Sequence, residues 1–339
     1  MVEKHTELFA QYLRRYDEVG DVDVDNVEPP DASFKDLRPM VDRPKGDIEN
    51  ARPLSNVDVG LICALPETEL AEIHRVFPGL SIRSEGGSEV TFFDGMIETD
   101  DNDEDINPEG KTMISVAAAC QIEMGMVAAS FTTSEMIRIY RPRTIILTGI
   151  CAGYRRASTL GDLVVPSKVF DYGSGKLRNG KFLPDPRQVG PSDKALQYLR
   201  FGLGQEKVRD RLLQPYRSSA KSYGMKSKLP DLDGFQIRTD AMGSGSAVVV
   251  DPTVLDGVAE ADRKLCAIDM EAYGFMRTAR ALAPSSDYVV MKAVSDYADE
   301  EKNDDIQSYC SFVSARYARE YIVRKLVQKR QAVPGPRTA

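Results

Sequence analysis

The chain has 339 residues, a net charge of −8 at pH 7 and a sequence pI near 5.1. Its composition, 42% hydrophobic and 28% charged residues, is typical of a soluble globular protein with a large core. The acidic balance excludes a protein that binds nucleic acid through a broad basic face, although a local basic pocket for phosphates is compatible with it. The charged amino terminus has no signal core, and no apolar run reaches about 18 residues. We therefore expect a cytoplasmic protein without nucleic-acid or membrane partners.

Cysteine and histidine usage limits the possible chemistry. The five cysteines are widely spaced and form no CxxC pair, which predicts buried reduced thiols and not disulfides or a zinc site. The two histidines, His5 and His74, lie in different segments, which disfavours metal binding and Ser–His catalysis. We expect neither a metal nor a cofactor.

Residues 1–51 differ in composition from the rest of the chain. Residues 7–19 can form a short helix, and the acidic, proline-marked segment that follows is typical of an extension or linker. This extension either packs on the main domain or docks a regulatory partner. We assign residues 52–330 to one domain and residues 331–339 to a disordered tail.

Strand-like and helical patterns alternate through the main domain. Strands are expected at 57–65, 89–99 and 111–120, twice within 141–170, within 236–250, and at 267–268 and 288–294. Helices are expected at 65–78, 121–139, 252–265, 270–282 and 306–330. Residues 100–110 are acidic but lack the glycine and terminal Glu of a calcium loop, so we expect a solvated hairpin loop. The alternation predicts an α/β fold of three layers, α/β/α, with a central mixed and mostly parallel sheet.

The segment YVVMKAVSDYAD, residues 288–299, places a carboxylate at a sheet edge. Its apolar first half predicts a buried strand, and Asp296 comes directly after it, where ligands bind in open α/β sheets. A partly desolvated carboxylate there can hold a proton and donate it as a general acid. The alternative is that Asp296 caps the following turn or helix.

Three further segments at strand ends carry unusual residues. In TGICAG, small residues that include Gly149, Cys151 and Gly153 let backbone N–H groups approach a phosphate or sugar oxygen, although such glycines also simply form turns. Arg155 and Arg156 follow, either as phosphate ligands or as a solvated surface pair.

The other two segments are DMEA and SGSA. In the first, the Glu271 carboxylate beside Met270 suits a vicinal diol such as ribose, but helix capping is a serious alternative. The second, at residues 244–247, is small and exposes the backbone around Ser246.

Taken together, these segments resemble the nucleoside phosphorylase superfamily, within it the methylthioadenosine/S-adenosylhomocysteine nucleosidase branch. The matching stretches are VDVGLICALPETEL, QIEMGMVAAS, LTGICAGYRRASTLGDLVVPS, GSGSAVV, AIDMEAYGF and VVMKAVSDYAD. In detail they look most like the nucleosidase domains of bacterial immune effectors and fungal signalling proteins, some of which remove adenine from ATP. Homo-oligomers are usual in this family.

The resemblance implies roles for individual residues. Asp296 would protonate purine N7, Glu271 would bind the ribose hydroxyls with Met270 against the sugar, and Gly149 and Gly153 would line the ribose or phosphate end. The residue that activates water would lie in the first strand–helix turn, where simple alignment falls on Thr68. Glu67 and Glu69 flank it, and we prefer Glu69.

We therefore expect a purine nucleosidase that hydrolyses the N-glycosidic bond of an adenine nucleotide, with ATP as the best candidate. Arg155, Arg156 and Lys168 are expected to neutralise its phosphates. The alternatives are a methylthioadenosine/S-adenosylhomocysteine nucleosidase, a phosphate-dependent purine nucleoside phosphorylase, and a nucleotide sensor that binds without cleaving. The resemblance also implies a role as an antiviral defence effector.

Overall fold

The protein is described by a computed structural model that covers residues 56–82, 88–99, 112–201, 210, 236–299 and 306–331. All of these residues belong to one compact unit, Pro53–Ala339. The predicted extension 1–51, the acidic joint at 100–110 and the tail from residue 332 lie outside the described residues.

Four parallel strands form the centre of the sheet, in the order β14-β5-β1-β4. They are β1 (Val59–Cys63), β4 (Thr112–Cys120), β5 (Thr144–Gly153) and β14 (Asp287–Asp296). Their carboxyl ends meet at one edge of the sheet, which places the segments that follow them close together.

Shorter strands extend this centre on both sides. Antiparallel β3 (Phe92–Thr99) and β2 (Ser81–Ile82) continue beyond β4. Where β1 has ended, β5 pairs with antiparallel β13 (Leu265–Asp269). The sheet then continues through β12 (Ala241–Ser244), β7 (Lys168–Asp171) and β10 (Gln188–Val189), while β6 (Leu163–Val164) joins β14 to β11 (Ile237–Arg238). A separate hairpin is formed by β8 (Gly175–Arg178) and β9 (Lys181–Pro184).

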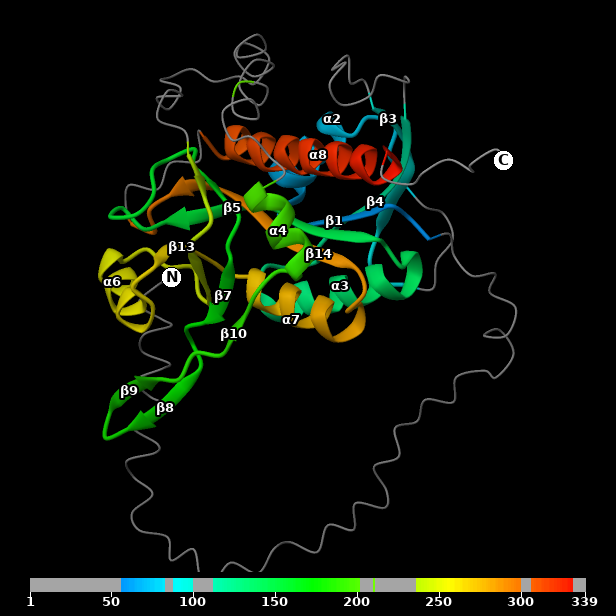
Figure 1. Cartoon of the computed structure of the whole chain (residues 1–339). Coiled ribbons are helices and arrows are strands. Elements are labelled where there is room, and N and C mark those ends of the chain that lie inside the picture. Colours follow the sequence, from blue (N-terminus) through cyan, green and yellow to red (C-terminus); the bar gives the residue numbers. More distant parts are fainter. Residues whose placement is uncertain are drawn as a thin grey trace, which may run out of the picture. The chain divides into compact units, whose positions relative to one another are not determined.

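Helices cover both faces of the sheet. Figure 1 shows α8 (Gln307–Gln331) on one face, and α3 (Met126–Tyr140) with α7 (Ala272–Leu282) on the other. The other helices among the described residues are the π-turn η3 (Pro66–Leu70), α2 (Ala71–Val76), α4 (Asp193–Phe201) and α6 (Pro252–Ala261).

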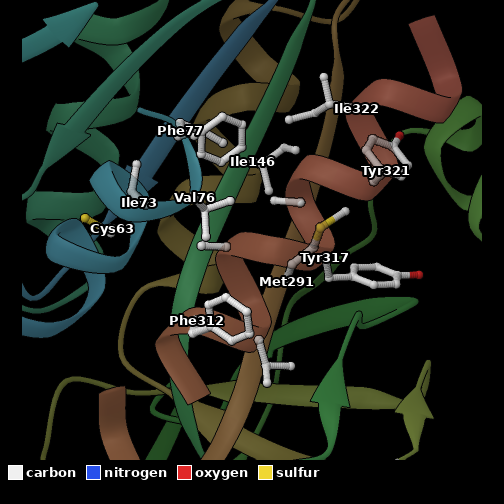
Figure 2. Close-up of a cluster of buried hydrophobic side chains, with 14 of the residues drawn as sticks. Cys63, Ile73, Val76, Phe77, Ile146, Met291, Phe312, Tyr317, Tyr321 and Ile322 are labelled. Atoms are coloured by element: carbon white, nitrogen blue, oxygen red, sulfur yellow. The ribbon is translucent and has the colours of Figure 1, made fainter. Parts of the chain in front are cut away.

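Apolar side chains alternate between the two faces along the central strands. In β1, Leu61 belongs to the cluster under α8, while Ile62 belongs to the cluster against α3 and α7. In β14, Met291 belongs to the cluster under α8 and Val290 to the cluster against α3 and α7. Figure 2 shows the first cluster, in which Phe312, Tyr317, Tyr321 and Ile322 of α8 meet Met291 and Ile146. This two-sided burial confirms the predicted α/β/α fold with a mixed sheet.

Two expectations about the elements need correction. The predicted helix at 252–265 ends at Ala261, and the chain enters β13 at Leu265, because Asp262 is extended and its carboxylate accepts the N–H of Lys264. The segment after β7, in which no element was predicted, contains the exposed β8–β9 hairpin. Among the described residues, no helix is both long and apolar enough to cross a membrane.

Candidate active site

A cavity of about 320 Å³ lies where the central strands end. Several segments that are far apart in the sequence contribute to it. The lining includes Leu65, Glu69, Met124, Ile150, Cys151, Val248, Val249, Asp269, Met270, Glu271, Lys292 and Asp296. Its size and its mixture of apolar walls with a few ionisable groups are typical of a site for a small molecule.

Glu69 reaches the cavity from the π-turn η3 that follows β1. The turn is closed by a 3.0 Å hydrogen bond from the Leu70 N–H to the Leu65 carbonyl, five residues back. A π-turn holds one more residue than an α-helical turn. The side chain of Glu69 is 2% exposed and lines the cavity, whereas Glu67 is exposed to solvent.

Three backbone N–H groups hold the Glu69 carboxylate. Ala64 and Leu65 donate to Oε2 at 2.6 and 3.1 Å, and Ile150 donates to Oε1 at 2.8 Å. These bonds connect the end of β1 to β5 at the point where the two strands separate. Burial raises the pKa of Glu69 from its ordinary value of 4.5, although Lys292 and the Ala64 N–H act in the opposite direction. Such a carboxylate is a stronger base than an exposed one.

Lys292 is a charged residue of the site that the sequence analysis did not single out. Its Nζ lies 2.7 Å from Glu271 Oε2 and 3.0 Å from Asp269 Oδ2. Burial acts to lower the pKa of Lys292, but the three carboxylates of Asp269, Glu271 and Glu69 outweigh it and raise the pKa well above its ordinary value. The signal was present in the sequence, since a lysine within an apolar strand has to find a buried partner.

The sequence left open whether the carboxylates of the DMEA segment cap a helix or are available to a ligand. In the structure, Asp269 and Glu271 differ in this respect. Asp269 Oδ2 accepts the N–H of Ala272 at 2.9 Å and thereby caps α7, while its Oδ1 accepts the hydroxyl of Ser244. Glu271 makes no such capping bond. Its oxygens accept the N–H of Gly125 at 3.0 Å and the ammonium of Lys292, so about two of its four acceptor positions remain for a ligand.

Asp296 is the last residue of β14 and is partly buried in the cavity wall. A bulge between Val294 and Asp296 shifts the register against β5, and bulges of this kind redirect a side chain. Oδ2 accepts the Ser295 hydroxyl and Oδ1 accepts the Ala298 N–H, each at 2.9 Å. The bond from the Ala298 N–H is the one expected if Asp296 caps the following turn. The same carboxylate also lines the cavity.

The predicted phosphate-binding cations lie in ion pairs outside this lining. Arg155 pairs with Asp299 at 2.5 Å and stacks over Tyr297, with 4.1 Å from its guanidinium carbon to the ring centre. Arg156 pairs with Asp256, and Lys168 pairs with Asp262. The structure therefore does not bring these cations together with the cavity.

Some of the remaining predicted site residues lie at the cavity and others do not. Cys151 and Met270 line the cavity, and Gly149 lies directly behind Glu69. Gly153 is a packing position, since a Cβ there would lie 2.6 Å from both Ser158 Oγ and Val294 Cγ1. Ser246 is exposed and is not part of the lining. No group of three or more His, Cys, Asp or Glu in the described part of the chain is arranged to hold a metal ion.

Comparison with known proteins identifies the family. Residues 58–322 match the sequence profile of the Phosphorylase superfamily. The chain belongs to this superfamily. A crystal structure of a Neisseria meningitidis 5′-methylthioadenosine/S-adenosylhomocysteine nucleosidase, in complex with methylthio-immucillin-A, has a TM-score of 0.55 and 17% identity. The similarity covers 79% of this chain and 98% of that one, and it confirms the fold.

Two relatives extend the comparison. The uncharacterized protein y4jS of Sinorhizobium fredii is 30% identical over 292 residues, which cover 84% of this chain and 65% of y4jS. The ATP nucleosidase Cap17 of Escherichia coli is 26% identical over 200 residues, which cover 58% of this chain and 39% of Cap17. The matched regions thus span less than two thirds of either relative.

Proposed function

We propose that this chain is a purine nucleosidase, an enzyme that hydrolyses the N-glycosidic bond of an adenine nucleotide or nucleoside. The observation that carries the proposal is the convergence of two carboxylates, Glu69 and Asp296, on one cavity from the ends of different strands. Paired carboxylates, one acid and one base, are the usual means of cleaving glycosidic bonds. The nucleosidases among the relatives and structural neighbours support the same reaction class.

In the proposed mechanism, Asp296 acts on the base and Glu69 acts on water. Asp296 donates a proton to N7 of the purine, the bond between N9 and C1′ breaks, and its electron pair leaves with the neutral base. The cationic sugar is then attacked at C1′ by a water molecule whose proton passes to Glu69. Proton donation by a placed acid contributes roughly 10²- to 10⁴-fold to such a reaction.

Glu271 and Met270 are assigned to the sugar. The two acceptor positions that Glu271 retains suit the 2′- and 3′-hydroxyl groups of ribose, and Met270 supplies an apolar contact beside them. The contact with Lys292 fixes the Glu271 carboxylate, which keeps both hydroxyl-accepting positions in place.

Water is favoured over phosphate as the acceptor by the charge of the cavity. Besides Asp296, which carries the proton for the base, the carboxylates of Glu69, Asp269 and Glu271 line it, and Lys292 is already shared by the latter two. An incoming phosphate dianion would be repelled from such a wall. This distinguishes the proposed hydrolase from a phosphorylase.

ATP is the first substrate to test because of the similarity to the Cap17 ATP nucleosidase. A 5′-thioether nucleoside is the second candidate, because Met124, Val248 and Val249 give the cavity an apolar wall. A role in antiviral defence, homo-oligomers and regulation through residues 1–51 remain predictions from the resemblance. A cytoplasmic location remains a prediction from the composition.

The test measures the release of free adenine by chromatography, with ATP, AMP, adenosine and methylthioadenosine offered separately. The proposal expects adenine from at least one of them, at a rate independent of added phosphate. Asp296→Asn should abolish release while changing the Kd for substrate only slightly, because the amide keeps the shape of the carboxylate but cannot donate its proton in the same way. A sensor would bind these compounds and release no adenine in the wild type.

A further inference from the structure

Two cysteines end neighbouring strands next to the candidate site. Cys63 is the last residue of β1 and Cys120 the last of β4, and the two face each other in the parallel register. Neighbouring strands lie about 4.8 Å apart. This falls within the range of roughly 4.4–6.8 Å between Cα atoms that a disulfide bridges.

The two side chains also point to the same face of the sheet. Cys63 belongs to the apolar cluster under α8, as Figure 2 shows, and Cys120 packs against that cluster. The Cys63 thiol donates a 3.7 Å hydrogen bond to the carbonyl of Ala119, so its sulfur leans over β4 one residue before Cys120. After burial, the neighbouring Cys120 side chain is the next largest cause of the raised pKa of the Cys63 thiol. A disulfide therefore needs only a local adjustment of the two strand ends.

We propose that Cys63 and Cys120 form a reversible disulfide when a peroxide oxidises the protein, and that this bond inactivates the adjacent site. The pair contains the half-buried Cys120, whereas Cys151, Cys266 and Cys310 are all buried. The effect on the site rests on the proposed function, whereas formation of the disulfide does not.

Exposure sets the order of the chemical steps. Cys120 is half-buried and Cys63 is buried, so the peroxide meets the sulfur of Cys120 first. Attack of that sulfur on the O–O bond gives a sulfenic acid and one water. Cys63 then attacks the sulfenic sulfur, and the departing hydroxyl takes the thiol proton and leaves as a second water. Two thiols and one hydrogen peroxide thus give one disulfide and two waters, with both sulfur atoms oxidised and the peroxide reduced.

Burial makes Cys63 unsuitable as the first partner of the peroxide. Desolvation and the contact with Cys120 raise the pKa of the Cys63 thiol well above its usual range, so Cys63 stays protonated until a sulfenic acid forms beside it. Oxidation is therefore confined to the pair and does not begin in the core.

The link to the site is the peptide bond that follows Cys63. This peptide carries the Ala64 N–H, which holds Glu69 Oε2 at 2.6 Å. Drawing the Cys63 side chain toward β4 rotates this peptide and moves the Glu69 carboxylate. A displacement of about 1 Å at a reacting group can cost roughly 100-fold in rate, so we expect kcat to fall about 10- to 100-fold in the oxidised protein.

The experiment treats the full chain with a small excess of hydrogen peroxide, blocks free thiols with iodoacetamide, and analyses peptides by mass spectrometry. The expected product is a peptide pair that joins Cys63 to Cys120 and is lighter by two hydrogens than the separate peptides. Dithiothreitol should separate the pair. Absence of this link, or preferential linkage or oxidation of other cysteines, overturns the proposal.

Activity is measured on the same samples. Wild type should lose adenine release on oxidation and regain it with dithiothreitol, whereas Cys120→Ser should keep its activity in peroxide. Cys266→Ala is the matched control, because it removes a buried thiol outside the pair and should remain sensitive to peroxide. A link that forms without changing kcat overturns the switch alone. A wild type that is inactive even when reduced contradicts the proposed function, while the mass measurement still decides whether the disulfide forms.

Discussion

The Oε1 oxygen of Glu69 occupies the space that a side chain on Gly149 would need. A Cβ built on Gly149 would lie 2.2 Å from that oxygen, and the glycine has a φ of +142°, which L-residues rarely adopt. The residue after it, Ile150, donates its N–H to the same oxygen. Because Gly149 has no side chain, the carboxylate can approach the end of β5. It accepts the Ile150 N–H there, beyond the point where the pairing of β5 with β1 has ended.

Gly149→Ala is therefore expected to displace the Glu69 carboxylate and to lower kcat by at least roughly 100-fold, the loss expected from a misplaced reacting group. The matched control is Gly257→Ala in the exposed surface of α6, where an added Cβ meets nothing within 4 Å. That change should stabilise the protein by roughly 0.5–1 kcal/mol and leave kcat unchanged. Equal kcat values for the two variants would show that Gly149 has no role in placing the carboxylate.

The raised pKa of Glu69 predicts the acid side of the pH profile. As a base, Glu69 must be ionised, so kcat/KM should rise with pH through an apparent pKa above 4.5. Glu69→Gln should abolish that rise together with most activity, whereas Glu67→Gln, at an exposed position of the same turn, should preserve both. An unchanged profile in Glu69→Gln would assign the base to another group.

The same shift has a consequence for stability. Because folding raises the pKa of Glu69, the folded state binds its proton more tightly than the unfolded state does. The free energy of unfolding of the wild type should therefore fall as pH rises from 4.5 through the raised value, and Glu69→Gln should remove this part of the decrease. Urea unfolding of both proteins across this pH range measures the difference.

Lys292 holds together the most buried charges of the site. Lys292→Met leaves the carboxylates of Asp269 and Glu271 buried without their cation, which should cost about 3–5 kcal/mol of unfolding free energy. Lys176→Met, at an exposed position of β8, is the control and should change stability by less than about 0.5 kcal/mol. Similar urea midpoints for both variants would contradict the assigned ion cluster.

Ser314 supports the site from beneath, on helix α8. Its hydroxyl accepts the Gly149 N–H at 2.8 Å and donates to the Met291 carbonyl at 2.7 Å, so it ties β5 to β14. Ser314→Ala leaves both buried backbone groups without this partner and should cost about 1–3 kcal/mol, accompanied by a lower kcat. Ser311→Ala on the same helix removes a buried hydroxyl that has no partner, and it should cost little. Equal effects of the two changes would show that the hydrogen bonds of Ser314 contribute nothing beyond packing.

Much of the fold was predictable because the central elements are strongly patterned. The run from Tyr288 to Val294 and the helix that ends at Leu282 follow directly from apolar periodicity. Glu69 reaches the cavity from a π-turn, and this turn has no separate sequence signal. The pairing of Lys292 with Glu271 joins residues 21 positions apart, which periodicity cannot foresee.

The predicted phosphate ligands show a second limit of sequence reasoning. Arg155 and Arg156 follow the glycine turn directly, but the chain turns away there, and both side chains pair with acids from distant segments, Asp299 and Asp256. Neither arginine is part of the cavity lining. Conversely, Asp296 does line the cavity, because a strand end fixes where its last residue lies.

The central claim is hydrolysis by the pair Glu69 and Asp296, and adenine release in phosphate-free buffer tests it most directly. Wild type, Glu69→Gln, Asp296→Asn and Glu67→Gln are each incubated with ATP and with methylthioadenosine, and adenine and the sugar product are separated by chromatography. We predict adenine with a free reducing sugar from wild type and Glu67→Gln, and almost none from the other two. Adenine release that requires phosphate and gives a sugar 1-phosphate would contradict the account. So would adenine release that both Glu69→Gln and Asp296→Asn retain.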